Sequence, residues 1–103
     1  MTQDLRIPMA EEEIDHILKT LQKGLGRARV EMPDGVRLVW ENGWLLVRKS
    51  ITEPKITIRW EGQSIDDLKW IGQILAENFK SLSSHLEKAL DQVVSLSERD
   101  SRG

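Results

Sequence analysis

The chain has 103 residues, of which 39% are apolar and 31% are charged, and its formal net charge is -2. This length supports one domain with a modest core and leaves no second domain to close over a substrate. The sequence contains no cysteine, which excludes a disulfide framework and a thiolate metal site and makes the cytoplasm the expected location. No run is apolar enough to span a bilayer, and the N-terminus lacks a signal-peptide pattern, so no membrane partner is expected.

The first part of the chain predicts a strand followed by a helix. Apolar and polar residues alternate over residues 5–9, and Pro8 places this strand at a sheet edge or terminus because proline donates no ladder hydrogen bond. Apolar residues then recur at helical spacing over residues 14–25. Gly24 and Gly26 suit the end of this helix, since glycine accepts the left-handed cap conformation.

Three strands are predicted next, because the apolar period changes from helical to alternating. They span residues 36–41, 44–49 and 55–61. Asn42-Gly43 joins the first two and is the strongest short hairpin signal in the chain.

Taking Asn42 and Gly43 as a two-residue loop predicts that Glu41 pairs with Trp44 and Trp40 with Leu45. This register divides the hairpin into a core face and an open face. The core face of the hairpin and the third strand then carries Val36, Leu38, Trp40, Leu45, Val47, Ile56, Ile58 and Trp60. The open face carries Arg37, Val39, Trp44, Leu46, Arg48, Lys55, Thr57 and Arg59.

A second helix is predicted to begin after Ser64, which forms a variant capping box with Asp67. Its apolar stripe continues to Val93, which corresponds to a helix about 40 Å long. Two arrangements remain open: the helix overhangs the sheet, or it breaks near the serines at residues 81–84.

The element order is therefore strand, helix, three strands, helix (β-α-β-β-β-α). It predicts an α+β two-layer sandwich with a mainly antiparallel four-stranded sheet and two helices on one face. Residues 1–96 are expected to form a single domain, and residues 97–103 a frayed polar tail.

A possible anion site lies where the second and third of these strands meet. Residues Arg48-Lys49-Ser50-Ile51-Thr52-Glu53-Pro54 leave one strand for a short polar loop that leads into the next. The guanidinium of Arg48, the hydroxyls of Ser50 and Thr52, and the amides around Ile51 can converge on one phosphate. The sequence therefore predicts a phosphate-binding loop.

Positive charge is concentrated around this loop. Residues 36–60 contain five basic and two acidic residues, although the whole chain is acidic. Lys49 and Lys55 are predicted as secondary basic residues of the phosphate site. No nucleic-acid partner is expected, because the basic cluster is small.

The loop and its surroundings resemble the C-terminal domain of the alpha-D-phosphohexomutases, the family of phosphomannomutase, phosphoglucomutase and phosphoglucosamine mutase. That domain carries an Arg-x-Ser-Gly/Asn-Thr-Glu-Pro loop, which residues 48–54 match at every position except Ile51. Asp34-Gly35-Val36-Arg37 and Gly43-Trp44-Leu45-Leu46-Val47 precede the loop in the same context. The resemblance covers residues 5–90 and agrees with the predicted order of elements.

The resemblance implies a phosphate-binding, lid-like domain. In the family, this domain binds the phosphate of a phosphohexose that is not being transferred, so Arg48, Ser50 and Thr52 would contact that phosphate. Ile51 stands where the family favours Gly or Asn. The family's phosphoserine motif and magnesium loop are absent from these residues, so we expect no catalytic residue and no bound cofactor, Mg²⁺ being used on another domain of a full-length enzyme.

The alternative is a stand-alone interaction or phosphosugar-sensing module that reuses the fold without enzymatic activity. Trp44 on the open face would then dock the remaining mutase domains or another protein. The end of the second helix, residues 82–93, would support a homodimer. His16 and His85 have no second ligand at a suitable spacing, so no metal site is predicted.

Overall fold

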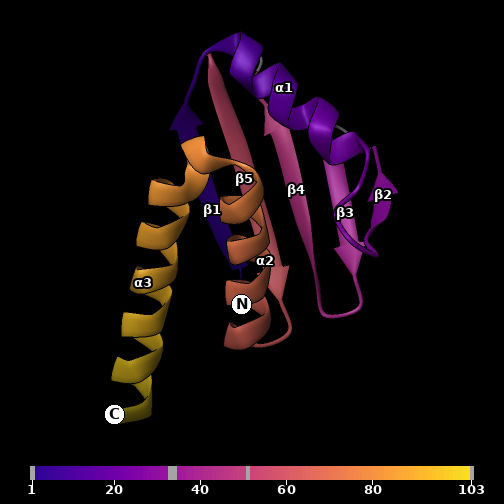
Figure 1. Cartoon of the computed structure of the whole chain (residues 1–103). Coiled ribbons are helices and arrows are strands. Elements are labelled where there is room, and N and C mark those ends of the chain that lie inside the picture. Colours follow the sequence, from indigo (N-terminus) through magenta and orange to yellow (C-terminus); the bar gives the residue numbers. More distant parts are fainter. Residues whose placement is uncertain (1, 33–34, 51, 103) are drawn as a thin grey trace.

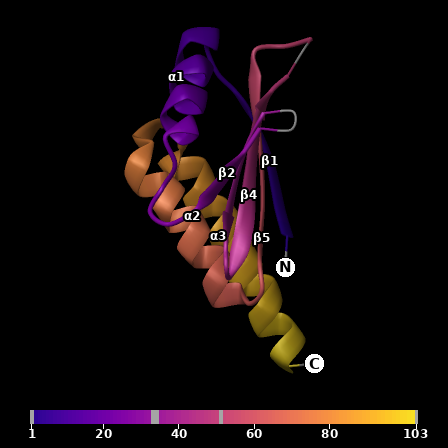
Figure 2. The ribbon, with the colours of Figure 1, turned by 90° about the vertical axis from the view of Figure 1, so that its right-hand side faces the viewer.

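The computed structural model describes residues 2–32, 35–50 and 52–102, and the surroundings of side chains for residues 3–32, 35–50 and 52–91. Helices α1 and α2 lie on one face of a sheet, and α3 packs beside α2 (Figures 1 and 2). In chain order, the elements are β1 (Thr2–Pro8), α1 (Glu11–Gln22), β2 (Arg29–Glu31), β3 (Val36–Trp40), β4 (Gly43–Lys49), β5 (Lys55–Gly62), α2 (Ile65–Asn78) and α3 (Lys80–Arg102). Among the described residues, no helix is both long enough and apolar enough to cross a membrane.

The strands form one antiparallel sheet in the order β1-β5-β4-β3-β2. The predicted α+β two-layer architecture is confirmed, and β1 lies at a sheet edge as Pro8 indicated. The sheet has five strands instead of four, because β2 forms the other edge. Its sequence, Arg29-Val30-Glu31, is too short and too polar to show the apolar alternation that marks a strand, and all three residues are exposed or half-buried.

The predicted core face is confirmed on all three central strands. The tryptophan of β5, Trp60, is fully buried, and its indole N–H donates a hydrogen bond of 3.1 Å to the carbonyl of Leu68 on α2. The other buried apolar side chains of these strands are Val36, Leu38, Leu45, Val47, Ile56 and Ile58, whereas Trp40, also predicted on this face, is half-buried against the core. Helices α1 and α2 cover them with Ile14, Ile17, Leu21, Leu68, Ile71 and Leu75.

The predicted register of the β3–β4 hairpin is wrong by two residues. Trp40 pairs with Gly43 and Val39 with Trp44, so the turn consists of Glu41 and Asn42. Because the shift is even, every side chain stays on its predicted face.

Close packing against neighbouring backbone explains why glycine occupies position 43. A Cβ there would collide with the carbonyl oxygen of Glu61 and with Cδ1 of Ile71. Among the described residues, positive φ occurs only at Gly24, Gly26 and Gly35. Gly43 therefore serves the close approach of β5 and α2 to β4, and a left-handed turn is not its role.

The long C-terminal helix breaks, which resolves the two arrangements left open by the sequence. The helix α2 begins as predicted, since the N–H of Asp67 donates to the Ser64 hydroxyl at 3.2 Å. It ends at Asn78, and the next residue, Phe79, is extended with a φ of -133° and a ψ of 92°. From Lys80 the chain turns back along α2 as α3 (Figure 1), and the α3 residues Leu82 and Leu86 are fully buried.

The predicted domain boundary at residue 96 falls inside α3, which runs to Arg102. The division into a domain and a tail stays a prediction.

Replacing Gly43 with alanine tests the close approach of β4 to its neighbours. We expect Gly43→Ala to lower the free energy of unfolding by about 1–3 kcal/mol, because the added methyl group overpacks against backbone that cannot move freely. Urea denaturation followed by tryptophan fluorescence measures the change.

Gly26→Asn is the matched control. A Cβ at Gly26 meets nothing within 4 Å, and its φ is +60°, a conformation that asparagine tolerates. We expect a loss below about 1 kcal/mol for this variant. Equal losses at both positions would show that packing at Gly43 is not the cause.

Candidate functional site

The polar loop predicted to bind phosphate connects β4 to β5 at the end of the sheet where α1 begins (Figure 1). The N–H of Ser50 donates to the carbonyl of Lys55 at 3.0 Å, and the N–H of Lys55 donates to the carbonyl of Glu53 at 2.8 Å. The Ser50 amide is therefore occupied within the loop. The predicted amides around Ile51 lie partly outside the described residues, because Ile51 itself is not among them.

A backbone hydrogen bond fastens the loop to another part of the chain. The N–H of Met9, between β1 and α1, donates to the carbonyl of Pro54 at 2.9 Å. The loop is thus joined to the residue that follows β1.

The three predicted phosphate ligands with described side chains border the loop. Ser50 and Thr52 line a hollow of about 500 Å³ together with Arg48. A guanidinium and two hydroxyls suit a phosphate chemically. The three residues therefore lie together around one hollow, and their role as phosphate ligands stays a prediction.

The two secondary basic residues each meet carboxylates. Lys49 projects from the same face of the sheet as Val47. Its Nζ lies 3.7 Å from a carboxylate oxygen of Glu11 and 3.6 Å from one of Asp15, both on α1. Lys55 forms an ion pair of 2.8 Å with Glu53. Much of the positive charge of these lysines is therefore compensated within the protein.

Two further residues line the same hollow and were missed by sequence reasoning. Arg6 of β1 pairs with Thr57 of β5, and Thr57 pairs with Arg48 of β4, so the three side chains form a row across neighbouring strands. Arg6 and Thr57 both line the hollow of about 500 Å³. The sequence predicted the strand that carries Arg6, but only the pairing of β1 with β5 brings Arg6 to the loop.

Gly35 allows β3 to begin close to Arg48. Its φ is +126°, and a Cβ would lie 2.5 Å from the carbonyl oxygen of Val47 and 2.7 Å from Cβ of Arg48. Any side chain at Gly35 would push against the backbone that carries Arg48. Gly35 therefore permits the close approach of the chain before β3 to the part of β4 that carries Arg48.

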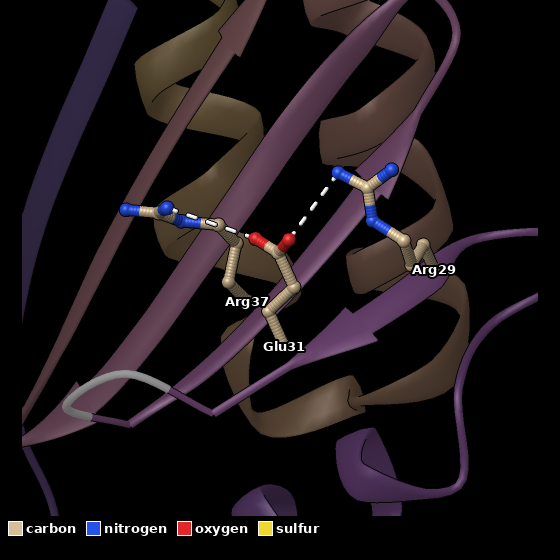
Figure 3. Close-up of polar contacts among 3 residues, drawn as sticks. All are labelled: Arg29, Glu31 and Arg37. Carbon is tan, nitrogen blue, oxygen red and sulfur yellow. Dashed lines mark ion pairs between the residues drawn. The ribbon is translucent and has the colours of Figure 1, made fainter.

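A second polar cluster lies on β2 and β3. The carboxylate of Glu31 forms one ion pair with Arg29 at 3.2 Å and another with Arg37 at 3.7 Å (Figure 3). Arg37 also lies 5.8 Å from the centre of the Trp44 ring, within cation–π range. Both arginines of this cluster thus already interact with side chains of the protein itself.

Trp44 lies on the open face as predicted, but it is half-buried. Its indole N–H donates to the carboxylate of Glu61 at 2.8 Å. The most exposed tryptophan is Trp70 of α2, which is 40% exposed and packs edge-to-face on Trp40 with ring centres 5.5 Å apart.

Other parts of the described chain suit a phosphate or metal less well. The hollow between α2 and α3, about 800 Å³, is lined by Lys69 but also by Glu77, Glu87 and Asp91, so its charge repels anions. Within the described residues, no cluster of His, Cys, Asp or Glu is arranged to hold a metal ion.

Comparison with known proteins gives one family. Residues 5–78 match the model of the family described as Phosphoglucomutase/phosphomannomutase, C-terminal domain. The chain is 30% identical over 87 residues to a protein of Pseudomonas aeruginosa PAO1 named Phosphomannomutase/phosphoglucomutase. Proteins of the same name from Pseudomonas putida KT2440 and Pseudomonas syringae pv. tomato are 31% and 28% identical over 88 residues.

These alignments cover 82% to 84% of this chain but 19% of each relative. The chain thus spans about one fifth of the length of the curated relatives it matches.

The ion pair between Glu53 and Lys55 predicts a pH-dependent contribution. The hydrogen bond and charge of Lys55 lower the pKa of the Glu53 carboxyl below its ordinary value. The stabilisation by this pair is present above the ordinary pKa of glutamate and is lost as the pH falls through the lowered pKa. We expect Lys55→Gln to raise the pKa of Glu53, as measured by carbon-detected NMR titration of its carboxyl group; an unchanged midpoint would exclude Lys55 as the cause.

Proposed function

Because this chain belongs to the phosphoglucomutase/phosphomannomutase C-terminal domain family, we propose that it binds the non-transferred phosphate of a phosphohexose as a lid-like part of a phosphosugar mutase. In this proposal the chain is not catalytic alone. The names of the matching relatives, Phosphomannomutase/phosphoglucomutase, support the substrate class.

One observation carries the proposal: Arg48, Ser50 and Thr52 line a common hollow beside the loop. The guanidinium of Arg48 can donate two parallel hydrogen bonds to phosphate oxygens, and the hydroxyls can donate to the others. Glu53, which would repel a phosphate, is held by Lys55.

The position of the hollow supports the lid-like role. It lies against the open face, which neither α1 nor α2 covers (Figure 2). Solvent and salt therefore screen a phosphate bound by this chain alone, so we expect weak binding. Other domains of a mutase would exclude water from the free side of the ligand.

The proposal includes no cofactor bound by this chain, and it assigns Mg²⁺ to another domain of a full-length enzyme. The cytoplasm remains the expected location.

An interaction module is the second candidate, and the uncovered apolar residues of the open face favour it. Val39, Trp44 and Leu46 are half-buried there with no helix above them. They would dock the remaining mutase domains or a protein partner. A homodimer through α3 has less support, since Leu82, Leu86 and Leu90 are buried within the domain itself.

Sedimentation velocity at increasing protein concentration tests the homodimer. Because the described apolar stripe of α3 is already buried, we expect a monomer at all concentrations. A reversible shift to a faster-sedimenting species would contradict this and would favour the interaction module.

Titration with phosphosugars tests the proposed function. We expect glucose 1-phosphate, mannose 6-phosphate or glucosamine 6-phosphate at millimolar concentration to shift amide resonances of residues 48–55 in ¹⁵N-labelled protein. Arg48→Gln is expected to weaken binding about tenfold, because charge-assisted hydrogen bonds are lost.

Arg27→Gln is the matched control, since it removes the same charge from an exposed turn between α1 and β2. Unphosphorylated glucose and mannose are the control ligands. The proposal fails if residues 48–55 do not respond to any of the three phosphosugars, or if they respond equally to the unphosphorylated sugars.

A further inference from the structure

Arg6, Thr57 and Arg48 form a row that crosses three neighbouring strands. Arg6 pairs directly with Thr57 and Thr57 pairs directly with Arg48. Side chains that lie opposite each other in a sheet project from the same face. All three therefore project from the open face, next to the phosphate-binding loop.

The spacing of strands places the two arginines within reach of one anion. Neighbouring strands are about 4.8 Å apart, so the backbones of Arg6 and Arg48 are separated by about 10 Å with Thr57 midway. Arginine side chains are long enough to meet above Thr57 from both sides. The hollow of about 500 Å³ that contains the loop hydroxyls is lined by all three residues.

The positive charge of Arg6 has no carboxylate partner among the described residues, unlike the charges of the neighbouring lysines. Lys49 lies against Glu11 and Asp15, and Lys55 pairs with Glu53. In the described part of the chain, by contrast, no ion pair or hydrogen bond involves the Arg6 side chain, which is exposed. An exposed guanidinium beside a second arginine favours an anion between them.

We propose that Arg6 and Thr57 complete the phosphate site, so that one phosphate is held between the guanidiniums of Arg6 and Arg48 with the Thr57 hydroxyl beneath it. The inference rests on the proposed function and extends it in two ways. It adds ligands from β1 and β5 that lie outside the loop motif, and it assigns the dianionic form of the phosphate monoester as the form that binds.

The dianion is favoured because two cationic groups flank the site. A phosphate monoester carries about 1.5 to 2 negative charges near neutral pH and has a second pKa of about 6. Loss of its second proton adds attraction to both guanidiniums. Phosphodiesters have no second proton to lose, so they gain nothing as the pH rises.

The charged groups around the hollow do not obscure this pH dependence. Arg48 faces it from β4, and Arg59 and Asp4 lie on the same sheet face of β5 and β1. Lys55 and Glu53 lie at the loop, and Lys49, which also lines the hollow, is paired with Glu11 and Asp15 of α1. The pKa of Glu53 is lowered, so this carboxyl stays ionised over the range in which the ligand titrates. The residues that line the hollow include no histidine.

Glucose 1-phosphate and inorganic sulfate are the probes, used at about pH 5 and about pH 7.5 on either side of the second pKa of a phosphate monoester. Sulfate is a dianion at both values and serves as the control anion. Amide shifts report affinity for the wild type and for Arg6→Gln, Arg6→Lys and Thr57→Val. Arg27→Gln is again the charge-matched control, and Thr57→Val keeps the shape of the side chain while removing its hydroxyl.

In the wild type we expect the affinity for glucose 1-phosphate to rise about tenfold from the lower to the higher pH, and the affinity for sulfate to stay constant. Arg6→Gln is expected to weaken the binding of glucose 1-phosphate about tenfold at the higher pH and to flatten the pH dependence of its affinity. Arg6→Lys keeps the charge but loses the fork, so it should retain the pH profile at reduced affinity. Thr57→Val should lower the affinity for both anions without changing the pH dependence of glucose 1-phosphate binding.

Three results would overturn the inference, and they differ from one another. If Arg6→Gln binds glucose 1-phosphate with the affinity and pH profile of the wild type while Arg48→Gln does not, the loop site stands and Arg6 is not part of it. If the wild type binds no glucose 1-phosphate at either pH, the proposed function fails as well. If Arg6 has only a structural role, Arg6→Gln would lower the affinity for both anions equally at both pH values. The pH dependence of glucose 1-phosphate binding would then stay unchanged, which would also contradict the proposal.

Discussion

Burial of one face of a five-stranded sheet under α1 and α2 is the constraint on which the rest of the molecule depends. Strand residues alternate between faces, so the residues packed against the helices fix the direction of all the others. Ile56 and Ile58 are fully buried, and Thr57 between them must therefore project from the uncovered face. The position of the candidate site follows from packing on the opposite side of the sheet.

The same alternation separates adjacent basic residues that look equivalent in the sequence. Arg48 projects from the open face, whereas Lys49 turns toward α1 and lies near Glu11 and Asp15. A run of basic residues at the end of a strand is thus divided between two environments. The residues Arg6, Thr57 and Arg48, which line the candidate site, come from three different strands.

The sequence predicted the features that depend on local pattern and parity. The faces of β3, β4 and β5 were correct even though the hairpin register was not, since an error of two residues preserves parity. The glycine in Asn42-Gly43 suggested a tight turn, but its role is to admit β5 and α2, and contacts with residues far away in the chain cannot be read from a dipeptide. The apolar stripe through Phe79 likewise continued across the break between α2 and α3, because both helices bury the same kind of residue.

The features that the sequence could not reveal depend on long-range pairing. The strand β2 carries no apolar alternation, and it is recognised only through its pairing with β3. Arg6 lies more than forty residues from the loop in the chain, and β5 is what joins the two. The loop motif alone was enough to group Arg48, Ser50 and Thr52 as candidate ligands, since these residues are close in sequence as well as in space.

The backbone hydrogen bond from Met9 to Pro54 has a consequence for how readily the loop accepts a ligand. It joins the loop to the end of β1, three residues after Arg6, and β1 is itself paired along β5. The two sides of the hollow are therefore parts of one continuous hydrogen-bonded backbone. Backbone that is already fixed by pairing loses less conformational entropy on binding a ligand than free backbone does, so this hydrogen bond would preorganise the candidate site as the chain folds.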